Sequence, residues 1–164
     1  MKDVAPPDLF YVRAARSLLE SGRHAAAQQE LERVDKDLQS HPDVLEVKWG
    51  IQAQGRKWPA CLDIAEAIVT AVPERPTGWI KRYFVLHKLQ RTQEALDRLF
   101  PGAEKFGDVP IIHYNLACYA AQLQYLWEAE KWLKQALEIG GIAYRKLALQ
   151  DIALEPLWKM IGRL

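Results

Sequence analysis

The chain of 164 residues is long enough to fold as one ordinary domain that buries about 70% of its unfolded surface. Hydrophobic residues make up 49% of the chain and charged residues 26%, a balance that is typical of a globular protein and excludes a disordered one. The formal net charge is +1, from 22 basic and 21 acidic residues, so no bulk charge favours nucleic acid or anionic membranes.

The start of the chain and its cysteines bear on location. No apolar run approaches the roughly 20 residues that span a bilayer, and the opening MKDVAPPDLF lacks the basic-then-apolar layout of a signal peptide. We therefore expect a cytoplasmic protein. Cys61 and Cys118 form no C-x-x-C motif, which favours two reduced thiols over a disulfide framework.

Four similar segments then follow one another at a period near 34 residues. They read GRHAAAQQEL, GRKWPACLDI, QRTQEALDRL and QYLWEAEKWL, beginning at Gly22, Gly55, Gln90 and Gln124. Each segment has a small residue, a large aliphatic residue four positions later and a third small or apolar residue three positions after that. The four sets are Ala27, Leu31, Val34; Ala60, Ile64, Ala67; Ala95, Leu99, Gly102; and Ala129, Leu133, Ala136. This pattern predicts two packed helices per repeat, because closely approaching helices need small side chains where they cross.

Glycine and proline predict the joints. We expect Gly22 and Gly55 to adopt positive φ where each first helix ends. Pro42, Pro73, Pro76 and the stretch 106–110 separate the units, and Pro101 is expected to end the second helix of the third unit early.

The repeats resemble the tetratricopeptide repeat, whose pattern is W-x2-L-G-x2-Y, then A-x3-F, then P. The best matches cover 79–99 and 115–141, and residues 144–158 are similar to the closing segment of small bacterial tetratricopeptide proteins of the "end-of-group" kind. The first-helix half is looser, with Tyr11, Val44, Trp79 and His113 in the aromatic slot.

That resemblance implies an all-α fold: a right-handed α-solenoid of four helical hairpins and a C-terminal capping helix. The hairpins would span about 8–41, 42–74, 75–108 and 109–141, with a capping segment over 142–164, in a single domain over 1–164. The resemblance also implies an interaction scaffold that is not an enzyme and needs no cofactor, and whose partner is a protein or peptide segment.

In such a superhelix the first helices line a concave groove. Spacing of i, i+4 and i+7 predicts the side chains on that groove: Val12, Arg16, Leu19; Leu45, Trp49, Gln52; Ile80, Phe84, His87; Tyr114, Cys118, Ala121. Asn115 is added as an amide able to bond a peptide backbone.

Three interpretations of the Trp49 and Phe84 positions stay open. The aromatic rings are anchors for a partner's helix or extended segment, they are core residues of a tightly wound solenoid, or the closing helix of this chain or of a second copy fills the groove. Val12 and Arg16 stand where some tetratricopeptide domains grip a C-terminal carboxylate, so that clamp is absent, although Arg16 with Arg13 favours an acidic partner.

Two other tryptophans offer a different function. Trp58 and Trp127 begin the second helices of the second and fourth units, at positions that usually face outward. If both are exposed, the chain is a candidate for self-association as a structural homo-oligomer.

No motif for catalysis or metal binding stands out. The histidines lie in four separate segments, without the i, i+4 pair of a zinc site. His113 and Cys118 are five apart, about 140° around one helix, so they cannot act together. A contact between His87 and Cys118 on neighbouring first helices stays open.

Overall fold

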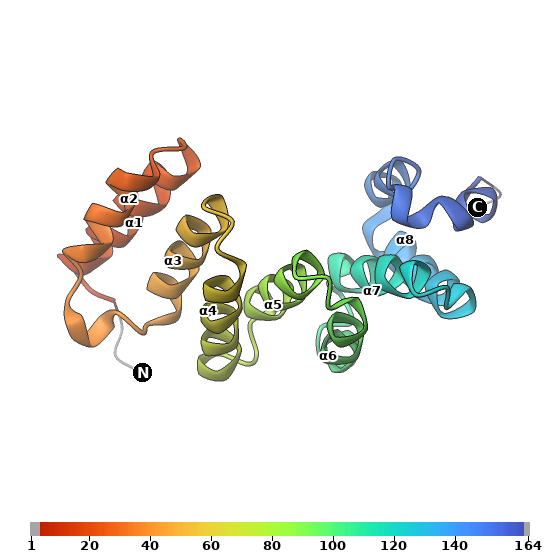
Figure 1. The fold of residues 1–164 in the computed structure, drawn as a ribbon, viewed down its shortest axis with the longest axis horizontal. Helices are drawn as coiled ribbons and strands as arrows, with labels where there is room; N and C mark the ends of the chain where they lie inside the picture. Colours follow the sequence, from red (N-terminus) through yellow and green to blue (C-terminus); the bar gives the residue numbers. More distant parts are fainter. Residues whose placement is uncertain (1–3, 163–164) are drawn as a thin grey trace. The chain divides into compact units, whose positions relative to one another are not determined.

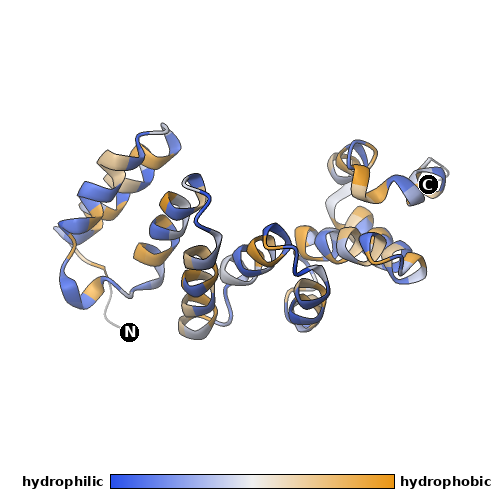
Figure 2. Cartoon of the chain, viewed as in Figure 1, coloured by the Kyte–Doolittle hydropathy of each residue, from blue (hydrophilic) through white to orange (hydrophobic). Residues whose placement is uncertain are grey.

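A computed structural model describes residues 4–162, and within that range all regular secondary structure is helical (Figure 1). Figure 2 shows hydrophilic and hydrophobic residues on every helix, as expected when each helix buries one side. The chain divides into two compact units between Val85 and Leu86. The division falls inside a helix of the third expected hairpin, so a single domain over 1–164 and its hairpin bounds remain a prediction.

The first unit contains two helical hairpins and most of a fifth helix. Its elements are α1 (Asp8–Glu20), α2 (His24–Glu32), the short 3-10 helix η1 (Lys36–Leu38), α3 (Pro42–Gln54), α4 (Trp58–Ala71) and the start of α5 (Pro76–Lys88). Helix α1 packs on α2 and on α3, and α3 packs on α4. Their core includes Val12, Ala15, Leu31, Val44 and Val47, which are almost fully buried.

The second unit contains the end of α5, α6 (Thr92–Lys105), α7 (Pro110–Gln122), α8 (Leu126–Ala148), the 3-10 helix η2 (Ile152–Leu157) and α9 (Trp158–Ile161). Helix α7 packs against α6, α8 and η2. Residues 116–121, in the middle and C-terminal part of α7, are therefore all buried. Gly141 breaks α8 with φ 61° and ψ −150°, a conformation open essentially to glycine alone.

The turn inside each hairpin is the same, and it repeats every 34 residues. Positive φ angles occur at Gly22, Arg56, Gln90 and Gln124. In each turn the next residue's N–H donates back to a carbonyl five positions earlier, as in Arg23 to Leu18 at 2.8 Å and Lys57 to Gln52 at 3.0 Å. Gly22 was therefore predicted correctly, whereas the prediction for Gly55 was wrong: its φ is −78° and Arg56 takes the left-handed position.

The buried slots follow the same spacing and correct the alignment of the second segment by one residue. Cys61 and Ala65 are fully buried, in register with Ala27 and Leu31 of the first hairpin, and Ile68 fills the third slot. Ala67, which the sequence alignment put in that slot, is exposed. A cysteine can replace alanine here because a reduced thiol packs as a small apolar group.

Pro101 does not end α6, which continues to Lys105. The proline removes one helical N–H, and its ring faces solvent at an exposed position. The next turn stays helical because Gly102 and Ala103 are buried there, so packing outweighs the lost hydrogen bond.

Candidate protein-binding site

Side chains of three helices meet on one face of the first unit, which we name the α1–α3–α5 face. It comprises Arg16, Glu46, Trp49, Lys81 and Phe84. The Glu46 carboxylate lies 3.9 Å from the Arg16 guanidinium and accepts a 2.8 Å hydrogen bond from the Thr77 hydroxyl. Glu46 thus links α1, α3 and α5 through polar contacts.

Aromatic rings gather at the other end of this face. The rings of Trp49 and Phe84 meet edge-on with centroids 6.0 Å apart, and Trp58 meets Phe84 in the same way at 6.1 Å. Phe84 keeps 39% of its surface exposed. The aromatic cluster is therefore packed on one side and accessible on the other.

A cation lies over this cluster. The Lys81 ammonium stands 4.3 Å from the Trp49 ring centroid, a distance at which cation–π attraction is effective. Burial lowers the pKa of Lys81, and the Arg16 charge adds to that shift while Glu46 opposes it. The Trp49 indole nitrogen is buried and has no hydrogen-bond acceptor among residues 4–162.

Near α1 the same face continues into a hollow of about 300 Å³. Val12, Arg13 and Arg16 line it on α1, and Asp43 lines it on α3. Arg13 and Arg16 thus both reach this hollow, as the sequence grouping of the two arginines suggested.

Three of the residues predicted for the groove lie elsewhere in the first unit. Leu45 is buried against Ile68 and Val72, and Leu19 packs into the α1 core beside Gly50. Gln52 lines a separate hollow of about 490 Å³ together with His24 and Gln28 of α2. The 34-residue spacing explains the difference for α3, since it places Glu46 and Gly50, not Leu45 and Trp49, in register with Val12 and Arg16.

In the second unit, the chain's own C-terminal segment lies against predicted groove residues. The Tyr114 hydroxyl donates to the Asp151 carboxylate at 2.8 Å, and the Cys118 thiol donates to the same oxygen at 3.5 Å. The other Asp151 oxygen accepts the N–H of Ala153 and begins η2. Burial raises the pKa of both Tyr114 and Cys118, and Asp151 adds to both shifts.

Ala121 is buried on α7, and the remaining predicted positions are half-buried. They are Ile80 and His87 on α5 and Asn115 on α7. The His87 ring packs against the Tyr119 ring in a tilted arrangement with centroids 5.3 Å apart. Burial lowers the pKa of His87 with a smaller contribution from Lys88, while Asp151 opposes the shift.

The structure separates His113 from Cys118. The His113 Nε2 atom lies 3.0 Å from the Gly107 carbonyl, and its ring stacks on Trp132, whereas Cys118 contacts Asp151. A thiol whose pKa is raised by burial is a poor nucleophile at neutral pH. Among the described residues, no group of three or more His, Cys, Asp or Glu side chains is arranged to hold a metal ion.

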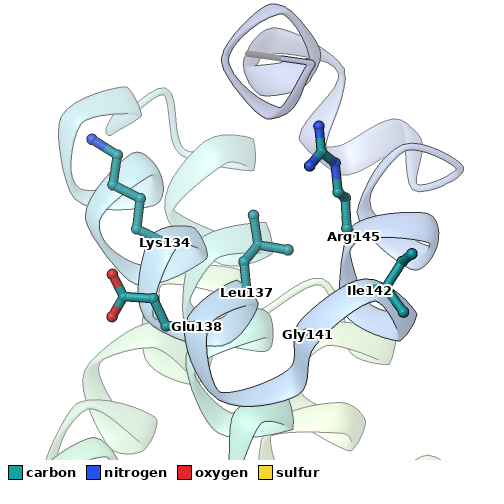
Figure 3. Close-up of a pocket in the computed structure, with 6 residues that line it drawn as sticks. All are labelled: Lys134, Leu137, Glu138, Gly141, Ile142 and Arg145. Carbon is teal, nitrogen blue, oxygen red and sulfur yellow. The ribbon is translucent and has the colours of Figure 1, made fainter. Parts of the chain in front are cut away.

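One further hollow, of about 510 Å³, lies where Gly141 breaks α8 (Figure 3). Lys134 and Arg145 lie on either side of Leu137, so basic side chains flank an apolar floor. Arg145 is also held by α9, since its guanidinium donates to the Ile161 carbonyl at 3.0 Å. None of the predicted groove residues lines this hollow.

Glu46, Lys81 and Asp151 were missed by reasoning from the sequence. An unbroken period of 34 would have identified Glu46 as the counterpart of Val12. Nothing local marks Asp151, because it meets Tyr114 from 37 positions away.

Comparison with known proteins identifies the fold. No protein-family model matches the chain, and no curated protein matches its sequence. Solved structures do match. The match to the MamA RS-1 ArsTM double mutant has 13% identity and a TM-score of 0.74, and it covers 98% of this chain and 92% of the MamA chain. TTC0263, a thermophilic TPR protein of Thermus thermophilus, is 22% identical with TM-score 0.70, over 95% of this chain and 84% of its own. MamA AMB-1 is 18% identical with TM-score 0.68, over 95% and 89%.

The chain therefore has the all-α repeat fold of the tetratricopeptide proteins. Within residues 4–162, no helix is both long and apolar enough to cross a membrane.

Proposed function

We propose that the protein is a non-enzymatic binding module that holds a segment of a partner protein on the α1–α3–α5 face. One observation carries the proposal: an exposed aromatic ring, Phe84, packs against Trp49, whose ring lies under the Lys81 cation and whose indole N–H has no acceptor in the described chain. Aromatic and basic side chains grouped in this way are typical of binding hot spots.

The chemistry of the face indicates what a partner would present. An apolar side chain would cover Phe84, and a carboxylate or carbonyl oxygen would accept from Lys81. Arg13 and Arg16 in the adjoining hollow favour an acidic residue at that end of the segment. The likeness to other tetratricopeptide structures supports the fold on which this proposal rests, not the identity of the partner.

The experiment is affinity capture on the immobilised protein, with each recovered partner quantified by mass spectrometry. Phe84→Ala and Lys81→Gln are expected to reduce recovery of the same partner at least about fivefold, the loss expected when a contact worth about 1 kcal/mol is removed. Phe10→Ala is the matched control, because Phe10 is an aromatic residue of α1 that is 62% exposed and lies outside the face.

Helicity measured by circular dichroism must be equal in all four proteins. Equal recovery by the wild type and by both face variants would rule out this face as the binding site.

Self-association is the second candidate function, and one observation favours it. Trp127 is 73% exposed and lines a hollow of about 660 Å³ with Pro156, Leu157 and Met160. Trp58 no longer supports this function, because its ring packs against Phe84. Sedimentation velocity that shows a monomer at every concentration would exclude the candidate, whereas a dimer lost in Trp127→Ala would support it.

A further inference from the structure

A pocket of about 430 Å³ lies between α6 and the first turns of α8, within the second unit. Phe100, Tyr125 and Trp132 supply aromatic walls. Phe100 and Trp132 meet edge-on with centroids 5.7 Å apart, and Phe100 is 52% and Tyr125 45% exposed. Three aromatic rings therefore surround a space that is open to solvent.

The other hairpins have no such rings. The 34-residue spacing puts a charged residue at each position that corresponds to Phe100 or Tyr125, and at two of the three that correspond to Trp132. The counterparts of Phe100 are Glu32, Glu66 and Lys134; those of Tyr125 are Arg23, Lys57 and Arg91; those of Trp132 are Glu30, Ile64 and Arg98. The fold therefore does not require aromatic side chains here, and their presence calls for another reason.

The rim of the pocket is acidic. Asp97 and Glu128 both line it, and neither forms an ion pair with any residue in the range 4–162. Asp97 accepts one hydrogen bond, at 2.9 Å, from the neutral amide of Gln93.

The cations of the described chain reach only one of the three aromatic rings. Lys131 stands 5.7 Å from the Trp132 ring centroid, on the same helix. No cation of the described chain stands over the ring of Phe100 or of Tyr125. Unpaired carboxylates beside open aromatic faces are the combination that attracts a basic side chain.

We propose that this pocket is a second binding site, which takes an arginine side chain from an extended or helical segment of a partner protein. A guanidinium fits better than an ammonium because it is planar, stacks on aromatic rings and donates to two carboxylates at once. The site lies on α6 and α8, on residues separate from those of the α1–α3–α5 face, so it stands or fails independently of the function proposed above.

The test uses the full chain and the peptide acetyl-Gly-Arg-Gly-amide, with acetyl-Gly-citrulline-Gly-amide as the neutral isostere. Binding is followed by NMR through the indole N–H signal of Trp132. The arginine peptide is expected to give a saturable shift, and the citrulline peptide to bind about fivefold more weakly or less. The double variant Asp97→Asn/Glu128→Gln is expected to lose the difference between the two peptides, and Phe100→Ala to weaken the arginine peptide by a similar factor.

Glu104→Gln is the matched control, since Glu104 is an exposed carboxylate of α6 outside the pocket, and its affinity should equal that of the wild type. Equal binding of the two peptides, or an unchanged preference in the double variant, would overturn the proposal. So would a dimer, seen by sedimentation, that Phe100→Ala abolishes while the arginine peptide gives no shift, because a second copy would then be the occupant.

Discussion

The hydroxyl of Tyr114 and the carboxylate of Asp151 are joined by a 2.8 Å hydrogen bond that attaches the C-terminal segment to α7. The same carboxylate also accepts from Cys118 and from the N–H of Ala153. One side chain therefore holds the start of η2 and satisfies two groups that are buried on α7. Cys118, which the sequence analysis placed on the concave groove, is a donor in this structural contact.

Removal of the Asp151 carboxylate should loosen this segment. Asp151→Ala leaves two buried donors of α7 without an acceptor, and we expect it to lower the free energy of unfolding by about 2–3 kcal/mol. Tyr114→Phe removes one bond and should cost about 1 kcal/mol. Hydrogen exchange of the backbone amides of 152–157 measures the effect locally, with Asp108→Ala, at an exposed acidic residue, as control. Unchanged protection in Asp151→Ala would show that η2 is held by apolar packing alone.

The buried thiol predicts a loss of stability at high pH. Burial and the Asp151 charge raise the pKa of Cys118 above its ordinary 9.0 in the folded state, so folding favours the neutral thiol. That stabilisation is complete below pH 9 and is lost above it, because the unfolded chain releases the proton first. The expected slope is about 1.4 kcal/mol per pH unit for this one group.

Denaturant unfolding at pH 7 to 10.5 measures this slope. Between pH 9 and 10 the free energy of unfolding should fall less steeply in Cys118→Ala than in the wild type. Burial also raises the pKa of Tyr114, but its ordinary pKa is 10.0, so Tyr114 contributes less to the slope in this range. A slope that is identical in the variant and the wild type would contradict this assignment.

The four hairpin turns each place one residue at positive φ, and only the first of these residues is a glycine. Arg56, Gln90 and Gln124 adopt positive φ, which costs a residue with a Cβ about 1–2 kcal/mol and costs glycine little. Each change to glycine should therefore stabilise by about 0.5 kcal/mol after the entropy of the unfolded glycine is counted, and Gly22→Ala should destabilise by about 1 kcal/mol. Thermal unfolding midpoints provide the measurement.

Gly55→Ala is the control for this series. Its φ of −78° suits any residue, and an added Cβ would meet the nearest atom at an ordinary 3.5 Å. Stabilisation by both Gly55→Ala and Arg56→Gly would support the turn position found in the structure. Destabilisation by both variants would instead indicate that Gly55 adopts the left-handed conformation.

The repeat period was sufficient to predict the fold class, because a small residue and a large one at i+4 impose the same helix crossing each time. The second segment was misaligned for a physical reason: Gly55 and Ala60 look like a turn glycine and a crossing alanine. The structure uses Arg56 and Cys61 instead, since a side chain can be strained into a turn and a thiol can pack as alanine does.

The candidate site was less predictable, because it depends on contacts between helices. Helical spacing identified Arg16 and Phe84, but Lys81 lies over Trp49 only because α3 and α5 approach each other closely. Asp151 reaches α7 through a turn after α8 that no local pattern specifies. The aromatic pocket between α6 and α8 was missed because Phe100 and Tyr125 belong to different hairpins.

The close approach of α4 and α5 gives the last prediction. Gly78 is buried on α5, and a Cβ added there would stand 2.8 Å from Cγ2 of Ile68 and 3.0 Å from the backbone nitrogen of Val69. The Ile68 side chain is fully buried and the Val69 nitrogen belongs to a helix, so neither can move aside easily. We expect Gly78→Ala to lower the free energy of unfolding by about 1–3 kcal/mol, even though alanine is intrinsically better in a helix by about 1 kcal/mol. Gly107→Ala is the control, since its Cβ would meet only the Ala103 carbonyl, at 3.6 Å. If Gly78→Ala proved as stable as the wild type in denaturant unfolding, α4 and α5 would have to separate without cost, and the contact between them would not limit stability.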